Sequence, residues 1–329
     1  MNQETENQST DTEALLGKIP VGISSCLLGQ EVRFDGGHKR DSYVMGTLSD
    51  YFEFVPFCPE AAVGLGIPRQ PIRLVRRGEE VRAVGVRTPD LDPTDDLAAF
   101  ASRTASQLGY ISGYILKNAS PSCGMERVKV YNDKGMPERI GVGIYAGVLM
   151  KTLPLLPVEE EGRLGDAVLR ENFIERVFVY HRWQQMMRDG LTPNELVEFH
   201  SDHKYMILAH NQEAYRQLGR MVADAGKADL DQLAADYVSI LMTTLKRPAT
   251  PRQHVNVLQH LLGYLKEHLD KIDREEMTET IEQYRQGLLP LIVPITLIRH
   301  HFRRYPDPYV MRQYYLSPHP KELMLRNRV

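Results

Sequence analysis

The stretch Ile19-Pro20-Val21-Gly22-Ile23-Ser24-Ser25-Cys26 is an apolar run that ends in two serines and a cysteine. Short apolar runs that stop at Ser, Pro or Gly are typical of buried strands. Two similar runs follow in the first half of the chain, residues 52–57 directly before Cys58 and residues 110–116 shortly before Cys123. The pattern predicts three strands, each followed by a cysteine beyond its carboxyl end.

Helix signals lie between and after these strands. Asp92-Pro93-Thr94-Asp95 supplies a capping side chain, a proline for the first turn and carboxylates near the positive end of the helix dipole, so we expect a helix to about Leu108. Residues 72–76 and 82–86 are expected to form a hairpin, and residues 143–151 a second helix. Alternating strands and helices predict an α/β domain with a mostly parallel sheet.

The second half of the chain has a helical period from Asn172 onward. Thr192-Pro193-Asn194-Glu195 and Thr250-Pro251-Arg252-Gln253 both carry the capping-box pattern of a helix start, and Gly190 ends the helix before the first of them. Apolar residues at helical spacing follow these starts. The second half is therefore predicted to be an all-α domain of six or seven helices.

Length and composition favour two domains, because 329 residues exceed one ordinary core of roughly 150 residues. The charged stretch at 159–162 separates the two patterns, so we expect an α/β domain over residues 18–162 and a helical domain over residues 163–329. Residues 1–17 are polar and acidic and lack the features of a secretory signal. They are predicted to be a disordered tail.

The charge and the cysteine count exclude several classes of protein. A net charge of -3 gives no overall attraction to nucleic acid, so any RNA contact must come from a local patch, and no DNA partner is expected. The longest apolar run, residues 287–298, contains two prolines and is shorter than the roughly 20 residues of a membrane span. Three cysteines are too few for a disulfide framework, which favours a reducing cytoplasmic location.

The three cysteines form a candidate site. Carboxyl ends of neighbouring parallel strands meet at one edge of a sheet, so Cys26, Cys58 and Cys123 are expected to converge there. Their neighbours, such as Cys58-Pro59-Glu60, are turn-forming and polar, which suits thiolates that bind soft metals. Free cysteine is also among the most buried residue types. The residues alone leave both a shared metal site and three inert buried thiols open.

Five segments of the first half carry a specific resemblance, which covers about residues 18–160. In order and spacing they resemble the motif set of the thiouracil desulfidase family. The remaining half resembles, more loosely, the helical domain fused to this module in desulfidases that act on 4-thiouridine in transfer RNA. The five segments are Ser25-Cys26-Leu27-Leu28-Gly29, Val32-Arg33-Phe34-Asp35-Gly36-Gly37-His38-Lys39, Phe57-Cys58-Pro59-Glu60, Gly64-Leu65-Gly66-Ile67-Pro68-Arg69 and Lys117-Asn118-Ala119-Ser120-Pro121-Ser122-Cys123-Gly124.

The resemblance implies a 4Fe-4S cluster held by Cys26, Cys58 and Cys123. Three protein thiolates for four irons leave one iron open for the sulfur of a substrate, as an open position marks a catalytic zinc site. Polarisation of the C–S bond and attack by an activated water then release hydrosulfide without net electron transfer. The implied activity is hydrolytic conversion of thiolated uracil to uracil.

Polar residues beside the cysteines are the candidate catalytic groups. Glu60 lies two residues from Cys58 and suits a proton donor and acceptor; the alternative is a solvated glutamate in a turn. Ser120 and Ser122 are expected to bond the pyrimidine or a cluster sulfide, or only to cap their own turn.

Four further residues are candidates for binding the substrate. Lys117 and Asn118 suit the edge of the base, and Ser25 and Arg33 lie next to the same motifs. For Arg33 the alternative is an ion pair with Asp35 that shapes the following glycine turn.

The helical half offers a candidate RNA surface. Arg299, Arg303 and Arg304 lie within about one and a half helical turns and are followed by several tyrosines, and Lys246 and Arg247 end an earlier helix. Basic residues interleaved with aromatic ones suit contacts with phosphates and bases. A solvated helix end that complements the dipole is the competing interpretation.

The family resemblance thus implies an iron-sulfur desulfidase that converts 4-thiouridine in tRNA to uridine, and the cysteine count adds the expectation of a cytoplasmic location. One alternative is the same chemistry on free thiouracil or thiouridine. Another is a non-catalytic RNA-binding or regulatory protein whose cysteines hold zinc or remain inert.

Overall fold

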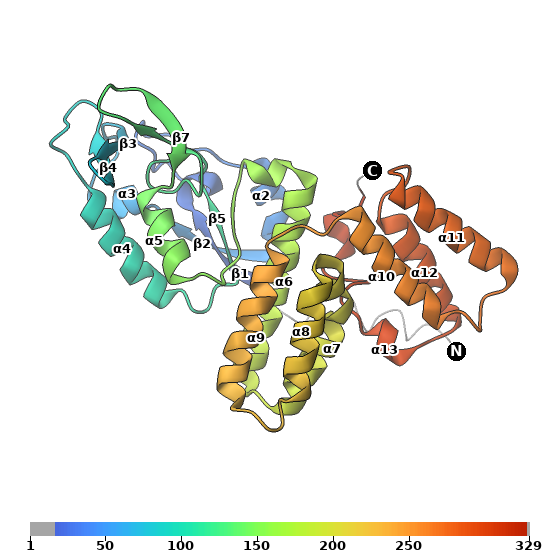
Figure 1. Ribbon diagram of the computed structural model, residues 1–329. Helices are drawn as coiled ribbons and strands as arrows, with labels where there is room; N and C mark the ends of the chain where they lie inside the picture. Colours follow the sequence, from blue (N-terminus) through green and yellow to red (C-terminus); the bar gives the residue numbers. More distant parts are fainter. Residues whose placement is uncertain (1–16, 328–329) are drawn as a thin grey trace. The chain divides into compact units, whose positions relative to one another are not determined.

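The computed structural model describes residues 17–327 of the chain. The chain divides into two compact units, which meet in sequence between Asp166 and Ala167. The sequence placed this boundary at residue 162. Residues 1–16 of the predicted tail lie outside the described residues. The predicted fold class is confirmed, since an α/β unit with a parallel sheet precedes a helical unit (Figure 1).

The first sheet of the α/β unit is entirely parallel. Its order is β2-β1-β5-β8, with β2 at Phe52–Phe57, β1 at Ile19–Ser24, β5 at Gly113–Leu116 and β8 at Val158–Glu160. The three strands predicted from the apolar runs are therefore present. Because β1 pairs in parallel with both β2 and β5, the carboxyl ends of the three strands lie side by side, as expected for neighbouring parallel strands.

A second four-stranded sheet has mixed pairing. Its order is β4-β3-β6-β7, with β4 at Glu80–Gly85, β3 at Ile72–Arg77, β6 at Val128–Tyr131 and β7 at Pro137–Gly141. The β3–β4 hairpin was predicted, whereas β6 and β7 were not. Strand β7 is an exposed edge strand, so it lacks the buried alternation that identifies a strand in sequence.

Two helices of the α/β unit pack against each other and support the sheets. Helix α4 covers Thr94–Gln107, and α5 covers Ile144–Thr152. Tyr145 of α5 meets Tyr114 of β5, with the two hydroxyl oxygens 3.2 Å apart. This contact fixes α5 over the strand that leads towards Cys123. The shorter helices of the unit are η1 Ser25–Leu28, α2 Ser42–Gly46, η2 Leu48–Asp50, α3 Pro59–Ala62 and η3 Arg163–Gly165.

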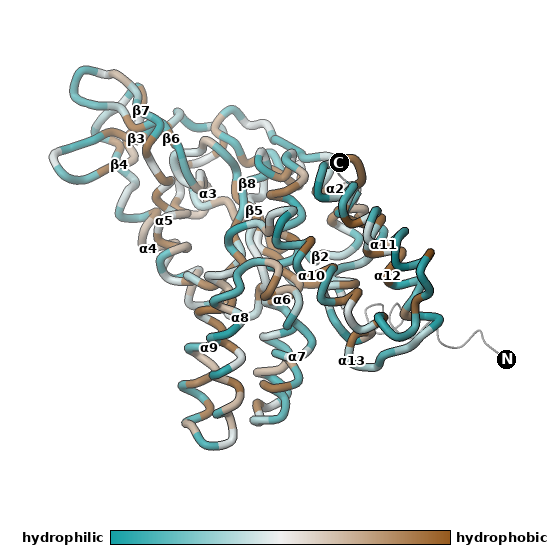
Figure 2. Tube along the Cα trace, turned by 45° about the vertical axis from the view of Figure 1, so that its right-hand side comes forward, coloured by the Kyte–Doolittle hydropathy of each residue, from teal (hydrophilic) through white to brown (hydrophobic). Residues whose placement is uncertain are grey.

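The helical unit has two capping boxes at the predicted places. The hydroxyl oxygens of Thr192 and Thr250 accept hydrogen bonds from the backbone N–H groups of Glu195 and Gln253, which start α7 and α10. Along the helices of this unit, hydrophilic and hydrophobic stretches alternate (Figure 2). Its helices are α6 Ala167–Asp189, α7 Pro193–His210, α8 Gln212–Ala223, α9 Leu230–Leu245, α10 Pro251–Tyr264, α11 Lys271–Arg285, α12 Ile292–Arg304, α13 Pro308–Met311 and η4 Lys321–Leu323.

The helical unit buries a large core between its later helices. The end of α7, at Tyr205 and Leu208, packs with residues of α10, α11 and α12, among them Leu258, Ile281 and Ile298. No helix among residues 17–327 is long and apolar enough to cross a membrane.

Candidate active site

A pocket of about 350 Å³ lies where the loops after β1, β2 and β5 meet. Cys26, Cys58 and Cys123 all line it, so the structure brings together the three cysteines that are far apart in sequence. It also brings to the same pocket every other residue proposed for catalysis or substrate binding. These residues are Ser25, Arg33, Glu60, Lys117, Asn118, Ser120 and Ser122.

Each cysteine is held by its local backbone. Cys26 lies in the η1 turn directly after β1, and its carbonyl accepts a hydrogen bond from the Lys39 N–H at 2.9 Å. Cys58 is the N-cap of α3, and its thiol donates to the carbonyl of Val32 at 3.7 Å. The Cys123 N–H donates to Ser120 Oγ at 3.1 Å. Strand ends and tight turns thus fix all three positions.

The three thiols are poorly exposed and favour their protonated form. Cys26 and Cys123 are buried, and Cys58 is half-buried. Burial raises the pKa of Cys26 to about 11 and the pKa of Cys123 to about 12, and it also raises the pKa of Cys58. Thiols of this kind become thiolates when a metal replaces the proton.

The donor set consists of three soft thiols, which suit iron. Among the described residues, no three His, Cys, Asp or Glu side chains converge on one point as ligands of a single metal ion do. Ligands of an iron-sulfur cluster are spread around it, each bound to its own iron. Three soft thiols on the wall of one pocket, without a fourth, fit a cluster that has three protein ligands.

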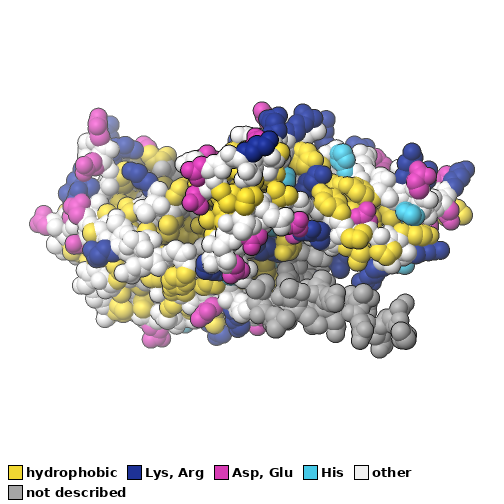
Figure 3. Space-filling model, turned by 90° about the horizontal axis from the view of Figure 1, so that it is seen from below, with side chains coloured by type: hydrophobic (Ala, Val, Ile, Leu, Met, Phe, Trp, Pro, Cys, Tyr) yellow, Lys and Arg dark blue, Asp and Glu magenta, His cyan; other side chains and the backbone are white. Residues whose placement is uncertain are grey.

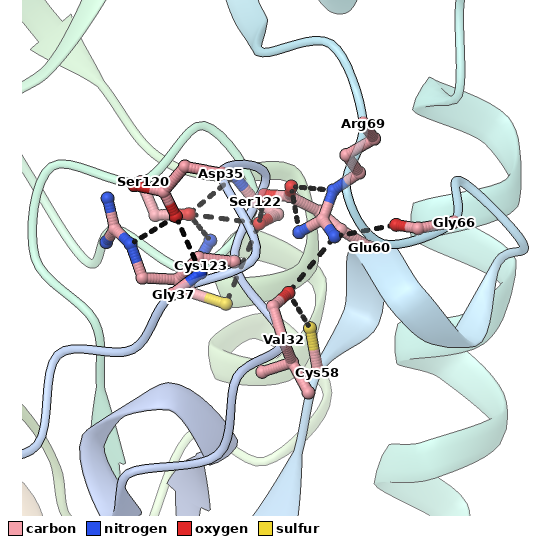
Figure 4. Close-up of polar contacts among 11 residues, drawn as sticks. Val32, Asp35, Gly37, Cys58, Glu60, Gly66, Arg69, Ser120, Ser122 and Cys123 are labelled. Atoms are coloured by element: carbon pink, nitrogen blue, oxygen red, sulfur yellow. Dashed lines mark hydrogen bonds and ion pairs between the residues drawn. The ribbon is translucent and has the colours of Figure 1, made fainter.

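Glu60 is held from two sides beside the thiols (Figure 4). Ser122 Oγ donates to Glu60 Oε1 at 2.6 Å, and Arg69 donates to Glu60 Oε2 through Nε at 2.9 Å. Arg69 Nη1 also donates to the carbonyls of Val32 and Gly66, both at 3.0 Å. The Arg69 and Glu60 side chains are only 5% and 14% exposed. The carboxylate is therefore fixed in one orientation, whereas the carboxylate of a solvated turn glutamate would be free to rotate.

The hydroxyl oxygens of Ser120 and Ser122 lie 3.0 Å apart, within hydrogen-bond distance, and their remaining partners differ. Ser120 Oγ accepts from the N–H groups of Ser122 and Cys123, which is the expected turn cap. Ser122 is almost fully buried, and its hydroxyl lies 3.7 Å from Cys123 Sγ as well as bonding to Glu60. The Ser122 hydroxyl therefore links the carboxylate to one of the thiols.

The amino end of α5 supports the serine loop. The Ile144 and Ala146 N–H groups donate to the carbonyls of Pro121 and Ser122. A Cβ atom at Gly143 would lie 2.5 Å from the Ser122 carbonyl oxygen, so only glycine permits this approach.

Lys117 and Asn118 are positioned by Glu161 from the end of β8. Lys117 forms an ion pair with Glu161, and the Asn118 N–H donates to Glu161 Oε2 at 2.7 Å. A Cβ atom at Gly162 would lie 2.5 Å from Asn118 Nδ2, so glycine makes room for the amide. The charge of Lys117 is therefore balanced within the protein.

Arg33 forms the ion pair with Asp35 that the sequence offered as the alternative to substrate binding. Its guanidinium pairs with Asp35 at 3.5 Å, and Asp35 Oδ1 accepts from the Gly37 N–H at 3.1 Å, which shapes the glycine turn. Arg33 still lines the pocket, next to the 38% exposed side chain of Phe34. Ser25 is buried at the pocket wall beside Cys26.

Arg69 and Glu161 were not predicted from the sequence, although both hold candidate residues in place. Arg69 lies inside the Gly64–Arg69 segment that carries the family resemblance, which was a usable signal. Glu161 lies in the charged stretch that was interpreted as a domain boundary. The structure shows that the same stretch ends a strand of the parallel sheet.

The candidate RNA-binding residues are on two different helices of the helical unit. Lys246 is the C-cap of α9 and Arg247 follows it, and both are exposed. Arg299, Arg303 and Arg304 lie in the last two turns of α12, where Arg299 is half-buried.

Comparison with known proteins identifies both parts of the chain. The family model described as 2-thiouracil desulfurase matches residues 21–161, and a model described as a protein of unknown function, DUF1722, matches residues 204–320. The uncharacterised protein YbgA of Escherichia coli is 37% identical over 153 residues, which are 46% of this chain and 90% of YbgA. The uncharacterised protein YbbK of Bacillus subtilis is 31% identical over 134 residues, which are 39% of this chain and 87% of YbbK.

A solved structure is similar as well. The [4Fe-4S]-dependent thiouracil desulfidase TudS has 33% sequence identity, with 45% of this chain and 95% of that chain covered and a TM-score of 0.37. The family models and the two curated relatives show that the chain belongs to the 2-thiouracil desulfurase family through residues 21–161 and carries a DUF1722 domain in its helical half.

Proposed function

We propose that this protein is an iron-sulfur-dependent desulfidase that converts 4-thiouridine in tRNA to uridine by hydrolysis. The observation that carries the proposal is one pocket lined by Cys26, Cys58, Cys123 and the fixed carboxylate of Glu60. Membership in the 2-thiouracil desulfurase family supports the reaction class.

The three cysteines would hold a 4Fe-4S cluster. When bound, such a cluster supplies an open iron that accepts the sulfur of the substrate and weakens the C–S bond. The overall change exchanges sulfur for oxygen: water adds to the ring carbon, the C–S bond breaks and hydrosulfide leaves. No electron donor is needed, because the carbon keeps its oxidation state.

Glu60 is the group we assign to proton transfer. Its Oε1 accepts the Ser122 hydroxyl and its Oε2 accepts Arg69, so the carboxylate is oriented before a substrate arrives. In that position it takes a proton from the attacking water and gives one to the departing sulfur. Arg69 acts as a positioning residue that prevents Glu60 from turning into solvent.

Lys117 and Asn118 are assigned to the edge of the pyrimidine. Asn118 offers its NH₂ group to a ring that has alternating donors and acceptors, while its side-chain carbonyl accepts from Lys117 Nζ. Glu161 and Gly162 hold this pair in place from the next strand end.

The helical unit and its candidate basic residues support the choice of tRNA as the substrate. A nucleobase in folded tRNA is stacked, so it must be exposed before its sulfur can enter the pocket. We assign binding of the surrounding RNA to the DUF1722 domain.

Anaerobic reconstitution tests the proposal. Protein treated with iron and sulfide is expected to be brown, with broad absorption near about 400 nm from iron-thiolate charge transfer. It should then remove 4-thiouridine from tRNA with a matching gain of uridine, measured by mass spectrometry of digested nucleosides. A colourless protein, or survival of every thiolated nucleoside, contradicts the assignment.

A Glu60→Gln variant tests the proton-transfer role. We expect kcat to fall by about 100- to 10,000-fold, the usual range for loss of a general acid or base, while the iron content stays unchanged. Glu126→Gln is a matched control, because Glu126 is outside the pocket lining and pairs with Arg163. Equal activities of the two variants would exclude Glu60 from catalysis.

Free thiouracil is the second candidate substrate, favoured by the description of the family model. The two candidates differ in the use of the helical unit. Steady-state comparison of 2-thiouracil, 4-thiouracil, 4-thiouridine and thiolated tRNA separates them, since the tRNA proposal requires the highest kcat/KM for tRNA.

A further inference from the structure

Four rings of the helical unit form two consecutive stacked pairs. Tyr264 and Tyr309 have ring centroids 6.4 Å apart at 23°, and His268 and Tyr305 have centroids 5.1 Å apart at 14°. The partners are four residues apart on each segment and run in opposite directions, so the two pairs follow one another. We call these four residues the aromatic ladder.

The aromatic ladder is anchored on one side and open on the other. Tyr305 and Tyr309 are partly buried against the core of the later helices. Tyr264 is 40% exposed, and His268 is also exposed. A ring held by a packed core presents its free face with little loss of conformational freedom, which favours stacking of a flat ligand.

Two cations lie over the ladder. Lys204 Nζ is 5.4 Å from the Tyr309 ring centroid, and the Arg304 guanidinium is 5.4 Å from the centroid of Tyr305. Lys204 forms a side-chain hydrogen bond with Tyr309, and among residues 17–327 no ion pair joins Lys204 or Arg304 to a carboxylate. The nearby Asp307 uses its carboxylate to accept from the Val310 N–H at the start of α13. Both cations therefore remain available to an anionic ligand.

The surface around α10–α13 has this mixed character in a wider view. On the right-hand side of Figure 3, where these helices lie, Lys, Arg and His side chains, together with some Asp and Glu side chains, are interspersed with hydrophobic ones. Aromatic rings with uncompensated cations beside them are the usual combination for unpaired nucleotides, in which bases stack and phosphates meet the cations.

We propose that the aromatic ladder, with Lys204 and Arg304, is the surface on which the helical unit binds unpaired nucleotides of its tRNA. This inference rests on the proposed function and gives the RNA contact a defined place. It replaces Lys246 and Arg247 at the end of α9 as the main contact and keeps only Arg304 of the three arginines on α12.

Equilibrium binding of purified tRNA to the full chain tests the surface, measured over a range of salt concentrations. For a Tyr264→Ala/His268→Ala double variant we expect the Kd to rise about tenfold, from lost base stacking, with the salt dependence unchanged. For Lys204→Gln we expect a higher Kd and a slope of log K against log salt that is smaller by about 1, from one lost phosphate contact.

Control variants separate this effect from misfolding and from general charge. Tyr264→Phe keeps the ring and should retain the parent Kd. Lys271→Gln removes a lysine whose side chain is 87% exposed on α11, and should leave both Kd and slope unchanged. Lys246→Gln should also have little effect.

Any one of three outcomes would contradict the proposal that the aromatic ladder binds tRNA. The first is a parent-like Kd in the Tyr264→Ala/His268→Ala variant, and the second is no tRNA binding by the parent. The third is a higher Kd for Lys204→Gln while the Tyr264→Ala/His268→Ala variant keeps the parent Kd, as an acidic protein ligand would give. Binding that behaves as predicted while tRNA keeps its sulfur overturns the proposed function alone. The two proposals thus fail separately.

Discussion

The pocket of the α/β unit and the buried ionic cluster of the helical unit both remove ionisable side chains from solvent, but they arrange them differently. In the helical unit, Glu175 accepts from His210 Nε2 at 3.0 Å and pairs with Arg326 Nη2 at 3.4 Å. Arg326 also meets Glu171 and donates to the Tyr315 carbonyl. The members of this cluster are each other's partners, so the cluster connects the end of the chain with α6.

The pocket differs because its polar groups surround an open volume of about 350 Å³. Glu60 is fixed by Arg69 and Ser122, yet it still lines the pocket beside three thiols. Burial of charge alone therefore does not identify a functional site. What distinguishes the pocket is a set of soft ligands and an oriented carboxylate around space that a substrate can enter.

The largest effect is expected when one thiol of the pocket in the α/β unit is removed. Cys123→Ala should abolish iron binding and desulfuration together, since one of three cluster ligands is removed. Iron and sulfide analysis with an activity assay checks this, and circular dichroism should show an intact fold. A variant that keeps its iron and its turnover would show that Cys123 is an inert buried thiol.

In the buried ionic cluster of the helical unit, the corresponding change is Glu175→Ala. Removal of one member of a buried ion pair leaves Arg326 and His210 without it, and should reduce the free energy of unfolding by about 3–5 kcal/mol. Urea denaturation followed by the fluorescence of Trp183, the only tryptophan, reports the helical unit. Turnover of free 4-thiouridine at low temperature should persist.

Glu282→Ala is the control for this loss of stability. Glu282 pairs with Arg285 on the surface of α11, where an ion pair contributes little. A similar loss of stability in both variants would mean that the burial of Glu175 has no special weight.

A smaller effect is expected from pH in the helical unit. Burial lowers the pKa of His200 to about 4 and the pKa of His203 to about 3, so both imidazoles are neutral in the folded state. The unfolded chain takes up protons below its ordinary pKa of about 6.5. The contribution of these two histidines to stability is therefore complete above that pH and falls as the pH drops from about 6.5 towards 4, by on the order of 1–3 kcal/mol at pH 5.5.

Urea midpoints at pH 7.5 and 5.5 measure this effect, again through Trp183, which stacks on the Tyr237 ring bonded to His200. His200→Gln should reduce the difference between the two midpoints. Stability that rises towards acid pH would contradict the assignment.

The smallest expected effect is loss of a helix cap. Thr192→Ala breaks the capping box at the start of α7 and should destabilise the helical unit by about 1 kcal/mol. Thermal denaturation of the variant beside Thr192→Ser, which keeps the hydroxyl, isolates the cap. Equal melting temperatures of the two variants would show that this cap contributes nothing.

Local signals explain which parts of the fold could be predicted. The strands before Cys26 and Cys58 are apolar runs with clear ends, and both capping boxes use fixed spacing, so each is visible in a few residues. Strands β6 and β7 were missed because β6 is placed by pairing with β3 and β7 by pairing with β6, and β7 has almost no buried residue.

The residues of the site also fall into those that local motifs reveal and those that only the fold brings together. The cysteines and Glu60 lie in compact motifs, so their meeting at one sheet edge followed from strand order. Arg69 and Glu161 could not be assigned, because each acts on a partner that only the folded loops bring near. Arg69 meets Glu60 across 9 residues of sequence, and Glu161 meets Asn118 across 43.

The strand order β2-β1-β5 has a consequence for how the enzyme matures. The first two cysteines follow adjacent strands, but the third follows a strand that comes after the β3–β4 hairpin and α4 in the chain. A nascent polypeptide must therefore extend beyond Cys123 and add its third strand before all three thiols share one pocket. Under the proposed function, delivery of iron and sulfide to the complete site must follow that point of synthesis.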